Sequence, residues 1–484
     1  MKLNFFVLLS VILMSTSCSY FEDTKLGRWM ASDISPAFGE GVAPGDLRWE
    51  VRFNMPDCNH PGKKKGAWCK QSDSKKAAKK SGVEDRLKSW INDPNVKSLH
   101  LAYFSFSNSA VKKALCEGLK KRPDLFMTIY MNYDTVDYAR SYFKKCSKTN
   151  VKVYSRGVGP FGTPGAHLQH SKIFLASEMK ELKPLAYYTP GEKQMYTKAL
   201  ESRIRFTSSS ANMSSFGTNI YFENWLFLDA PADDYIAQQN VCAFQAYSVG
   251  QGLDEAGESV DDRNSFSREY YRCVKATEKK MKIKPRKDIS FYLVPSYKMP
   301  KPYTAMGKVV RGAKKEVLMA IHRLGTSYVS KKLLKSVSGL VDVKIIFDDD
   351  TLRVGKKQGG PAFDVGPNDV LNYRALRNCS DVYFMETNAC ANAKCKAQLF
   401  HNKFIVTDRS LFQGAGNFTA TALNIYGVGN YEQFYKIDIP EIVQVYRRAW
   451  YELKRRATRQ DLHESFDNPD RTIKKQGGWP TFID

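Results

Sequence analysis

The chain has 484 residues, and its 74 Lys and Arg against 50 Asp and Glu give a formal net charge of +24. With 43% hydrophobic and 13% aromatic residues it can bury a large core, in about two or three domain-sized units. This composition excludes intrinsic disorder and collagen-like structure. The positive charge favours a polyanionic partner or an anionic surface.

The first residues have the order of a secretory signal. Lys2 precedes an apolar run at 5–14, and small residues at 15–17 lead to Cys18. The run is too short for a transmembrane helix, which needs about 18 or more apolar residues. Residues 1–17 therefore predict an exported protein, and a resemblance to bacterial signals implies one that is anchored to the membrane, periplasmic or secreted. They resemble a lipoprotein signal, in which Cys18 is lipidated, although Ser15 stands where Leu is usual; ordinary cleavage is the alternative.

Ten cysteines in an exported chain predict disulfide bonds. The simplest pairings to propose are Cys58 with Cys69 and Cys390 with Cys395, because each pair is close in the sequence. Lipidation of Cys18 would leave nine cysteines, so at least one thiol would stay unpaired. The spacing does not repeat the CxxC pairs of zinc ribbons, so it does not favour a metal site.

An internal repeat divides the chain into two halves. A strand, helix, strand order at 99–106, 109–120 and 126–133 recurs at 316–321, 328–338 and 341–347. Each copy predicts an α/β unit in which helices pack on a parallel or mixed sheet. The expected parts are a basic, irregular extension at 18–80, the two halves at 81–229 and 301–440, a connecting segment with some helix at 230–300, and an amphipathic helix and tail at 441–484.

Each half then reaches a His-x-Lys pair in a short predicted strand. The pairs are His170 with Lys172 and His401 with Lys403. Side chains alternate along a strand, so His and Lys of each pair project from the same face. One such pair is typical of any surface strand, whereas two pairs in matching repeat positions indicate a site.

Further polar residues follow each pair in the same order. A run of small residues ends in Asn212 in the first half and in Asn417 in the second. Each Asn is followed by a carboxylate, at Glu223 and Glu432. Four matching elements in the same order support a duplication.

These residues resemble the signature of the phospholipase D superfamily, in which HxK is followed by Asp and then by a small-residue turn and Asn. His401, Lys403, Asp408 and Asn417 fit this pattern fully. The first copy departs from it, because Ser177 occupies the Asp position. The resemblance covers most of the two halves. It implies two α-β-α sandwich halves related by a pseudo-twofold duplication, whose motifs form one active site.

Strand geometry indicates whether Ser177 in place of Asp affects catalysis. Asp408 lies an odd number of positions from His401 and thus on the opposite face of the strand, which favours a supporting role such as a turn hydrogen bond. In that case Ser177 removes little chemistry. The alternative is that the first half has decayed and the protein no longer turns over.

The resemblance implies phosphodiester cleavage through a phosphohistidine. His170 would attack phosphorus, while His401 would protonate the leaving oxygen and then activate water or an alcohol. Glu223 and Glu432 would orient the imidazoles. No metal or cofactor is expected, because four donors are available to hold the non-bridging oxygens: Lys172, Lys403, Asn212 and Asn417.

The leading hypothesis is a phospholipase D-like enzyme that hydrolyses phospholipids or transfers their phosphatidyl group, held at the membrane surface by a lipid anchor. One alternative is a secreted, metal-independent nuclease of the same superfamily, and another is a noncatalytic anion-binding lipoprotein. Two motifs in one chain complete a site, so we expect a monomer. Binding without catalysis predicts that the two histidines fail to converge. Lipid action predicts apolar side chains beside them, for which the candidates are Pro160, Phe161, Tyr187 and Tyr188.

Overall fold

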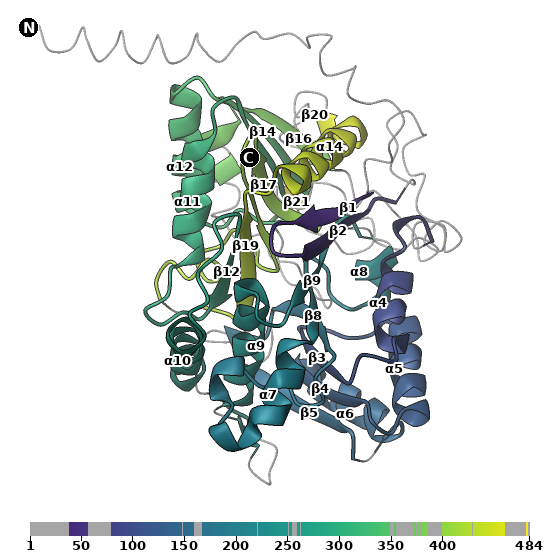
Figure 1. The fold of residues 1–484 in the computed structure, drawn as a ribbon. Helices are drawn as coiled ribbons and strands as arrows, with labels where there is room; N and C mark the ends of the chain where they lie inside the picture. The colour runs from purple at the N-terminus through teal and green to yellow at the C-terminus, as the bar shows by residue number, and fades with distance from the viewer. Residues whose placement is uncertain are drawn as a thin grey trace, which may run out of the picture.

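The computed structural model shows two large β-sheets with helices packed on them (Figure 1). The residues that the structure describes are 38–56, 79–147, 149–158, 167–219, 221–249, 251–253, 259–261, 263–348, 353–354, 372–373, 375–377, 379–385, 399–427, 429–459 and 481–482. The signal peptide with Cys18, the proposed cysteine pairs, and Pro160 and Phe161 lie outside these residues.

The first sheet has nine strands and the second has eight. The first runs in the order β1 (Phe38–Ala43), β2 (Leu47–Asn54), β9 (Glu223–Pro231), β8 (Arg203–Ser209), β7 (Lys172–Ser177), β3 (Ser98–Tyr103), β4 (Phe126–Asn132), β5 (Val151–Val158) and β6 (His167–Leu168). The second runs in the order β12 (Ile289–Val294), β19 (Glu432–Ile437), β18 (Leu411–Gly414), β17 (Lys403–Thr407), β13 (Glu316–Ile321), β14 (Asp342–Asp348), β16 (Asp381–Met385) and β20 (Thr458–Arg459). Two short pairs are separate: β10 (Gln251–Leu253) with β11 (Ser259–Asp261), and β15 (Arg353–Val354) with β21 (Thr481–Phe482).

The two large sheets repeat one topology. The order β2-β9-β8-β7-β3-β4-β5 in the first corresponds to β12-β19-β18-β17-β13-β14-β16 in the second. The directions also agree, because the first five strands of each series pair antiparallel and the last two pairings, β3–β4–β5 and β13–β14–β16, are parallel. The predicted α/β fold with two duplicated halves is confirmed.

The strand pairing extends each half beyond the expected boundaries. The expectation of an irregular extension is wrong for 38–54, where Leu47, Trp49, Val51 and Phe53 are buried and β2 pairs with β9. β12 pairs with β19 in the same way, although it lies in the expected connecting segment. Both strands belong to their sheets because an alternating apolar face is buried only when it is paired. We therefore propose that the halves begin at β1 and at β12.

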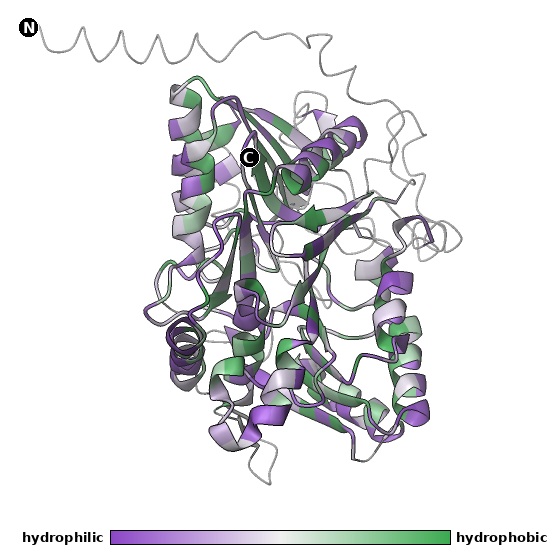
Figure 2. Ribbon diagram, viewed as in Figure 1, coloured by the Kyte–Doolittle hydropathy of each residue, from purple (hydrophilic) through white to green (hydrophobic). Residues whose placement is uncertain are grey.

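Helices cover the sheets and fill the space between them. The helices of the first half are α4 (Val83–Asn92), α5 (Ser109–Lys121), α6 (Val136–Lys144), α7 (Lys193–Leu200), α8 (Ser215–Asn219), α9 (Tyr235–Ser248) and α10 (Arg263–Met281), with 3-10 turns η1 (Tyr133–Thr135), η2 (Leu185–Tyr187) and η3 (Pro190–Glu192). Those of the second half are α11 (Pro302–Gly312), α12 (Ser327–Ser338) and α14 (Pro440–Arg456). Figure 2 shows α10 and α14 with strongly hydrophilic surfaces, whereas the strands behind α14 are mainly hydrophobic.

α9 and α14 occupy equivalent places, since they follow the equivalent strands β9 and β19. All but two of the 14 residues of α9 are buried, and it contacts β8 and β9 of the first sheet and β12 of the second. A helix that is buried on nearly every side belongs to the interior of a protein. The stretch after 230 is thus more than a connection, because its first helix completes the core between the halves.

An aromatic cluster joins the N-terminal strands to the second half. Phe53 of β2 packs edge-on against Tyr446 of α14 at 5.0 Å between ring centroids and against Phe404 of β17 at 5.9 Å. The Arg456 guanidinium at the end of α14 also donates to the carbonyl oxygens of Met55 and Pro56. These contacts hold the two halves in one fixed arrangement.

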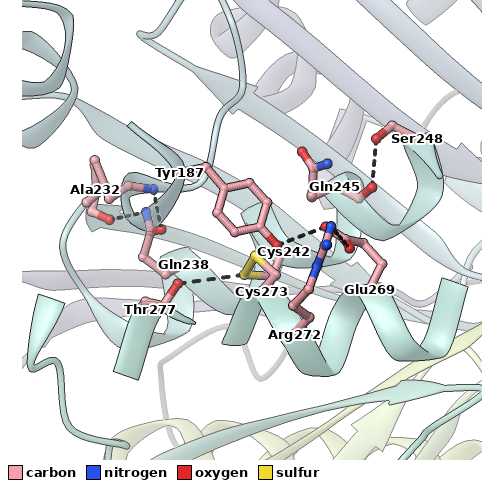
Figure 3. Close-up of a disulfide and its surroundings, with 11 residues drawn as sticks. Tyr187, Ala232, Gln238, Cys242, Gln245, Ser248, Glu269, Arg272, Cys273 and Thr277 are labelled. Atoms are coloured by element: carbon pink, nitrogen blue, oxygen red, sulfur yellow. Dashed lines mark hydrogen bonds and ion pairs between the residues drawn. A yellow bond between two sulfur atoms is a disulfide. The ribbon is translucent and has the colours of Figure 1, made fainter. Parts of the chain in front are cut away.

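Two disulfide bonds are present among the described residues. Cys116–Cys146 ties α5 to the end of α6, and Cys242–Cys273 ties α9 to α10 (Figure 3). Cys379 has a free thiol. Disulfides persist in oxidising compartments, so these bonds favour an exported protein.

Candidate active site

The two motif lysines begin equivalent central strands. Lys172 begins β7 and pairs with Tyr103 at the end of β3, while Lys403 begins β17 and pairs with Ile321 at the end of β13. Each motif histidine lies two residues earlier, just outside the strand. The site therefore lies where β3 and β4, and β13 and β14, have their carboxyl ends, which is the usual position of ligand sites in α/β sheets.

Backbone hydrogen bonds join each motif to the opposite half. The N–H of His170 donates to the carbonyl of Tyr431 at 2.9 Å, and the N–H of His401 donates to the carbonyl of Phe222 at 2.9 Å. Both contacts belong to isolated parallel bridges. The motif histidines lie outside the strands because their N–H groups are used in these bridges, and the repetition of the bridge defines the pseudo-twofold relation.

Two equivalent side chains support the bridges from the ends of the neighbouring strands. Asn132 at the end of β4 accepts the N–H of Gln169 at 2.9 Å through Oδ1. Asp348 at the end of β14 accepts the N–H of Phe400 at 2.5 Å through Oδ2. Asn132 and Asp348 thus fix the backbone just before each histidine, and both are fully buried.

The imidazoles pair with carboxylates of the opposite half. Nδ1 of His170 lies 2.8 Å and 3.0 Å from the two carboxylate oxygens of Glu432. Nδ1 of His401 lies 2.7 Å from Oε1 of Glu223. In each contact a proton lies between Nδ1 and the carboxyl group, so Nε2 of each ring stays available for chemistry. The crossed pairs bring both histidines and both glutamates into one site.

Each lysine turns back toward the histidine of its own motif. Nζ of Lys172 lies 3.1 Å from Nε2 of His170 and donates to the carbonyl of His170 at 2.8 Å. Nζ of Lys403 donates to the carbonyl of His401 at 2.8 Å. Both lysines are fully buried. Burial lowers the pKa of Lys172 to about 8, although Glu432 and Glu223 act against this decrease, and burial holds the pKa of Lys403 well below its usual range.

Burial also shifts the pKa of the acid and imidazole groups. It raises the pKa of Glu223 to about 8, while Lys403 and a hydrogen bond from Ser210 act to lower it. Burial lowers the pKa of His170 and, together with the charge of Lys403, holds the pKa of His401 well below its usual range. Lys403 influences His170 as well, so the two motifs share one electrostatic site. Such strongly shifted groups are typical of functional sites.

The two asparagines follow equivalent strands, β8 and β18. The Oδ1 atoms of Asn212 and Asn417 are buried and make no hydrogen bond with the described residues. Asn417 lies beside His322, whose pKa it acts to raise. The backbone of Asn212 is contacted closely by Gly217, where any Cβ would lie 2.4 Å from the Asn212 carbonyl oxygen. Binding of phosphate oxygens by these amides stays a prediction.

Asp408 and Ser177 make local backbone contacts away from the histidines. Oδ1 of Asp408 accepts the N–H groups of Lys314 at 2.9 Å and of Lys315 at 3.1 Å. Oγ of Ser177 accepts the N–H of Met179 at 3.0 Å. Asp408 thus ties its turn to the segment before β13, whereas Ser177 stabilises its own turn, and both contacts support the interpretation that neither residue takes part in the chemistry.

Aromatic side chains beside the histidines were not predicted from the sequence. The ring of Phe104, which follows β3, lies 5.7 Å from that of His170, and the ring of His322, which follows β13, lies 5.3 Å from that of His401. Tyr221 lies 6.3 Å from His401 on another side. None of the three belongs to the HxK pattern. Alignment of the two repeats at the ends of their first strands would have found Phe104 and His322.

The expected lipid-binding role of Tyr187 and Tyr188 is wrong. The hydroxyl of Tyr187 donates to Glu269 of α10 at 2.9 Å (Figure 3), and Tyr188 is buried in the core. Lys280 of α10 donates to the carbonyl of Tyr188. The segment that contains these tyrosines folds into η2, η3 and α7 and packs against α10, so the tyrosines stabilise the fold instead of forming an exposed apolar loop.

Two kinds of feature are absent from the described residues. No helix in the described part of the chain is long and apolar enough to cross a membrane. Within the same residues, no group of three or more His, Cys, Asp and Glu side chains is arranged to hold a metal ion.

Several solved structures are similar to this fold at low sequence identity. Phosphatidylserine synthase of Haemophilus influenzae Rd KW20 is 10% identical over 80% of this chain and 88% of its own, with a TM-score of 0.48. The yeast tyrosyl-DNA phosphodiesterase is 12% identical over 74% of this chain and 87% of its own, with a TM-score of 0.41. Nuc of Salmonella typhimurium, a phospholipase D family member, is 16% identical over 35% of this chain and 96% of its own, with a TM-score of 0.26. No protein-family model and no curated protein sequence matches this chain.

Proposed function

We propose that this protein cleaves or transfers phosphodiesters through a covalent phosphohistidine. The observation that carries the proposal is the pair of crossed His–Glu contacts, which leaves two Nε2 atoms in one buried site. Binding without catalysis predicted that the histidines would not converge, and the crossed contacts argue against that alternative.

In the first step, Nε2 of His170 attacks phosphorus and forms a P–N bond. The P–O bond to the leaving alcohol breaks, and His401 gives a proton to the leaving oxygen. The Glu223–His401 pair retains this proton at neutral pH, because burial raises the pKa of Glu223 to about 8. The proton is shared by the pair, since two coupled groups titrate together.

In the second step, water or an alcohol attacks the same phosphorus. His401 removes its proton, the P–N bond breaks, and His170 is regenerated. Negative charge on the non-bridging oxygens grows in both transition states, and the ammonium groups of Lys172 and Lys403 stabilise it, with the amides of Asn212 and Asn417 as further donors. Glu432 holds His170 in the tautomer that can attack.

Phospholipids are the leading substrate class in this proposal. The signal sequence predicts a lipid anchor at Cys18, which would keep the site at a membrane surface. Labelling of expressing cells with a radioactive fatty acid tests the anchor: wild type should carry the label and Cys18→Ser should not.

Nucleic acid is the second candidate, supported by one feature of the site. The Phe216 ring is partly exposed and lies 5.5 Å from the ring of Tyr221, which in turn lies beside His401. Aromatic rings beside a basic site bind unpaired bases by stacking. With a chain charge of +24, this arrangement also suits a single-stranded nucleic acid.

Turnover by the purified mature protein tests the proposal and chooses between the substrates. Labelled phospholipids and single- and double-stranded DNA are incubated in EDTA with wild type, His170→Ala and His401→Ala, after circular dichroism has confirmed that each variant is folded. We expect cleavage by wild type, none by His170→Ala, and a trapped phosphoenzyme in His401→Ala when the leaving group is p-nitrophenol, which needs no acid.

The outcomes separate the hypotheses. Lipid cleavage alone supports a phospholipase D-type enzyme, and DNA cleavage alone identifies a nuclease. Turnover by His170→Ala would refute His170 as the nucleophile. No turnover of any substrate by wild type would leave the noncatalytic anion-binding protein as the explanation.

A further inference from the structure

The pseudo-twofold relation exposes one chemical difference between the two sides of the site. In the first half β3 ends at Tyr103, opposite Lys172, and the next residue is Phe104. In the second half β13 ends at Ile321, opposite Lys403, and the next residue is His322. Phe104 and His322 are therefore equivalent positions of the duplicated fold.

Both rings pack against the motif histidine of their own half. Phe104 meets His170 edge-on at 5.7 Å, and His322 meets His401 at 5.3 Å with an angle of 58° between the ring planes. A hydrogen bond from the N–H of His322 to the carbonyl of Asn402 fixes the backbone at this position. At these equivalent positions the ring neighbour of the motif histidine is thus apolar for His170 and polar for His401.

The polar groups of His322 are not used by the fold. The residue is 4% exposed, and neither ring nitrogen makes a hydrogen bond of normal geometry with the described residues, although the Asn417 amide lies nearby. A buried imidazole without partners loses about 1–3 kcal/mol relative to a satisfied one, whereas Phe fills the same position without that loss. Packing alone therefore does not account for a histidine here.

The electrostatic surroundings keep this imidazole neutral. Burial, and then the charges of Arg323 and Lys403, hold the pKa of His322 well below its usual range. A neutral imidazole carries one N–H donor and one acceptor nitrogen. It can therefore donate to an alkoxide oxygen or accept from a hydroxyl group.

We propose that His322 is a third functional imidazole, which binds the oxygen that His401 protonates in the first step and deprotonates in the second. This inference rests on the proposed function. When the P–O bond breaks, an N–H of His322 donates to the leaving oxygen while His401 supplies the proton. When water or alcohol enters at the same position, the same N–H of His322 donates to its oxygen, and His401 takes the proton. His322 itself gains and loses no proton.

The test replaces His322 by the residue of the equivalent position. His322→Phe reproduces the Phe104 environment, which this fold already accommodates. Two probes are compared: bis(p-nitrophenyl) phosphate, whose leaving group needs little assistance, and a labelled dialkyl phosphodiester that wild type cleaves. We expect kcat/KM for the dialkyl ester to fall about 10- to 100-fold, as for loss of a hydrogen bond to a charged oxygen, with less than about a threefold fall for the p-nitrophenyl ester.

Two further variants separate this role from a structural one. His322→Gln retains a donor and an acceptor and should recover much of the dialkyl activity. Phe104→Leu, the matched change beside His170, should alter both probes by the same factor. His322→Phe should also change the ratio of transfer to hydrolysis when glycerol is added. In the second step the entering water or glycerol loses its contact with His322 in this variant.

The outcomes distinguish this inference from the proposed function. Equal losses on both probes, with an unchanged ratio of transfer to hydrolysis, would overturn the role of His322 and leave the phosphohistidine mechanism intact. An inactive wild-type protein would overturn both.

Discussion

At the scale of single residues, the site places two buried lysines and two buried glutamates in one cluster. They are Lys172, Lys403, Glu223 and Glu432. A buried charge is stable only beside an opposite charge and with hydrogen bonds, and the crossed pairs provide both. The consequence is that several groups titrate near neutral pH, which suits acid–base chemistry.

The pH dependence of turnover follows from these shifts. Lys172 is protonated below about pH 8 and the Glu223–His401 pair holds its extra proton over the same range, so both favourable forms are lost as the pH rises. We expect kcat/KM to fall above about pH 8 in a profile measured from about pH 6 to about pH 10. Lys172→Arg keeps its positive charge through this range. Its kcat/KM should therefore fall only because the Glu223–His401 pair loses its proton. A flat profile through the whole range would contradict these protonation states.

The crossed carboxylates can be tested by neutral replacement. In Glu432→Gln the amide no longer specifies the tautomer of His170, so we expect kcat to fall about 10²- to 10⁴-fold with little loss of folding. Glu316→Gln is the control, because Glu316 is a buried glutamate that contacts Arg447 outside the site. A comparable fall of kcat in the two variants would contradict the role of Glu432 in orienting His170.

At the scale of elements, the equivalent turns after β7 and β17 use different hydrogen bonds. Asp408 holds two N–H groups of the segment before β13, whereas Ser177 holds one N–H of its own turn. Burial acts to raise the pKa of Asp408, but the backbone hydrogen bonds prevail and lower it. The motif carboxylate therefore acts as an acceptor for the backbone.

Replacing Asp408 by the residue of the first copy should affect stability and not turnover. Asp408→Ser loses at least one charge-assisted hydrogen bond, so the free energy of unfolding should fall by about 1–3 kcal/mol at neutral pH while kcat stays within about twofold. Because a lowered pKa contributes stability that is lost as the pH falls, the difference from wild type should shrink below about pH 4. Urea unfolding at the two pH values measures this. A large loss of kcat in a folded Asp408→Ser protein would assign Asp408 to the chemistry.

At the scale of the whole molecule, one site depends on the relative placement of two halves. The bridges at Tyr431 and Phe222, the cluster of Phe53, Phe404 and Tyr446, and α9 all lie between the halves. Neither half contains a complete His–Glu pair, because each histidine uses the glutamate of the other. Folding and site assembly are thus one event.

Truncation of the aromatic cluster tests this dependence. Phe53 is 1% exposed, so Phe53→Ala should lower the free energy of unfolding by about 3–5 kcal/mol. Turnover should be lost at a correspondingly lower temperature, since the site requires both halves. The control is Tyr426→Ala, an aromatic truncation at a side chain that is 80% exposed, which should change stability by less than about 0.5 kcal/mol. Denaturant unfolding of the two variants against wild type supplies the comparison.

The sequence by itself determined the duplicated α/β fold, the strands that carry Lys172 and Lys403, and the proximity of each lysine to its own histidine. These features follow from hydrophobic periodicity and from the alternation of a strand, which act between near neighbours. Parity along one strand is local, so the sequence also predicted a supporting role for Asp408, which stays a prediction. The equivalent strands β2 and β12 were missed, since their partners β9 and β19 are far away in the chain.

Only the tertiary structure decided which glutamate serves which histidine. Glu432 reaches His170 and Glu223 reaches His401 across separations of 262 and 178 residues. The packing of Tyr187 against α10 and of His322 against His401 was decided in the same way. Such contacts depend on how complete sheets and helices pack, and no periodic pattern encodes them because burial of many side chains selects the arrangement collectively.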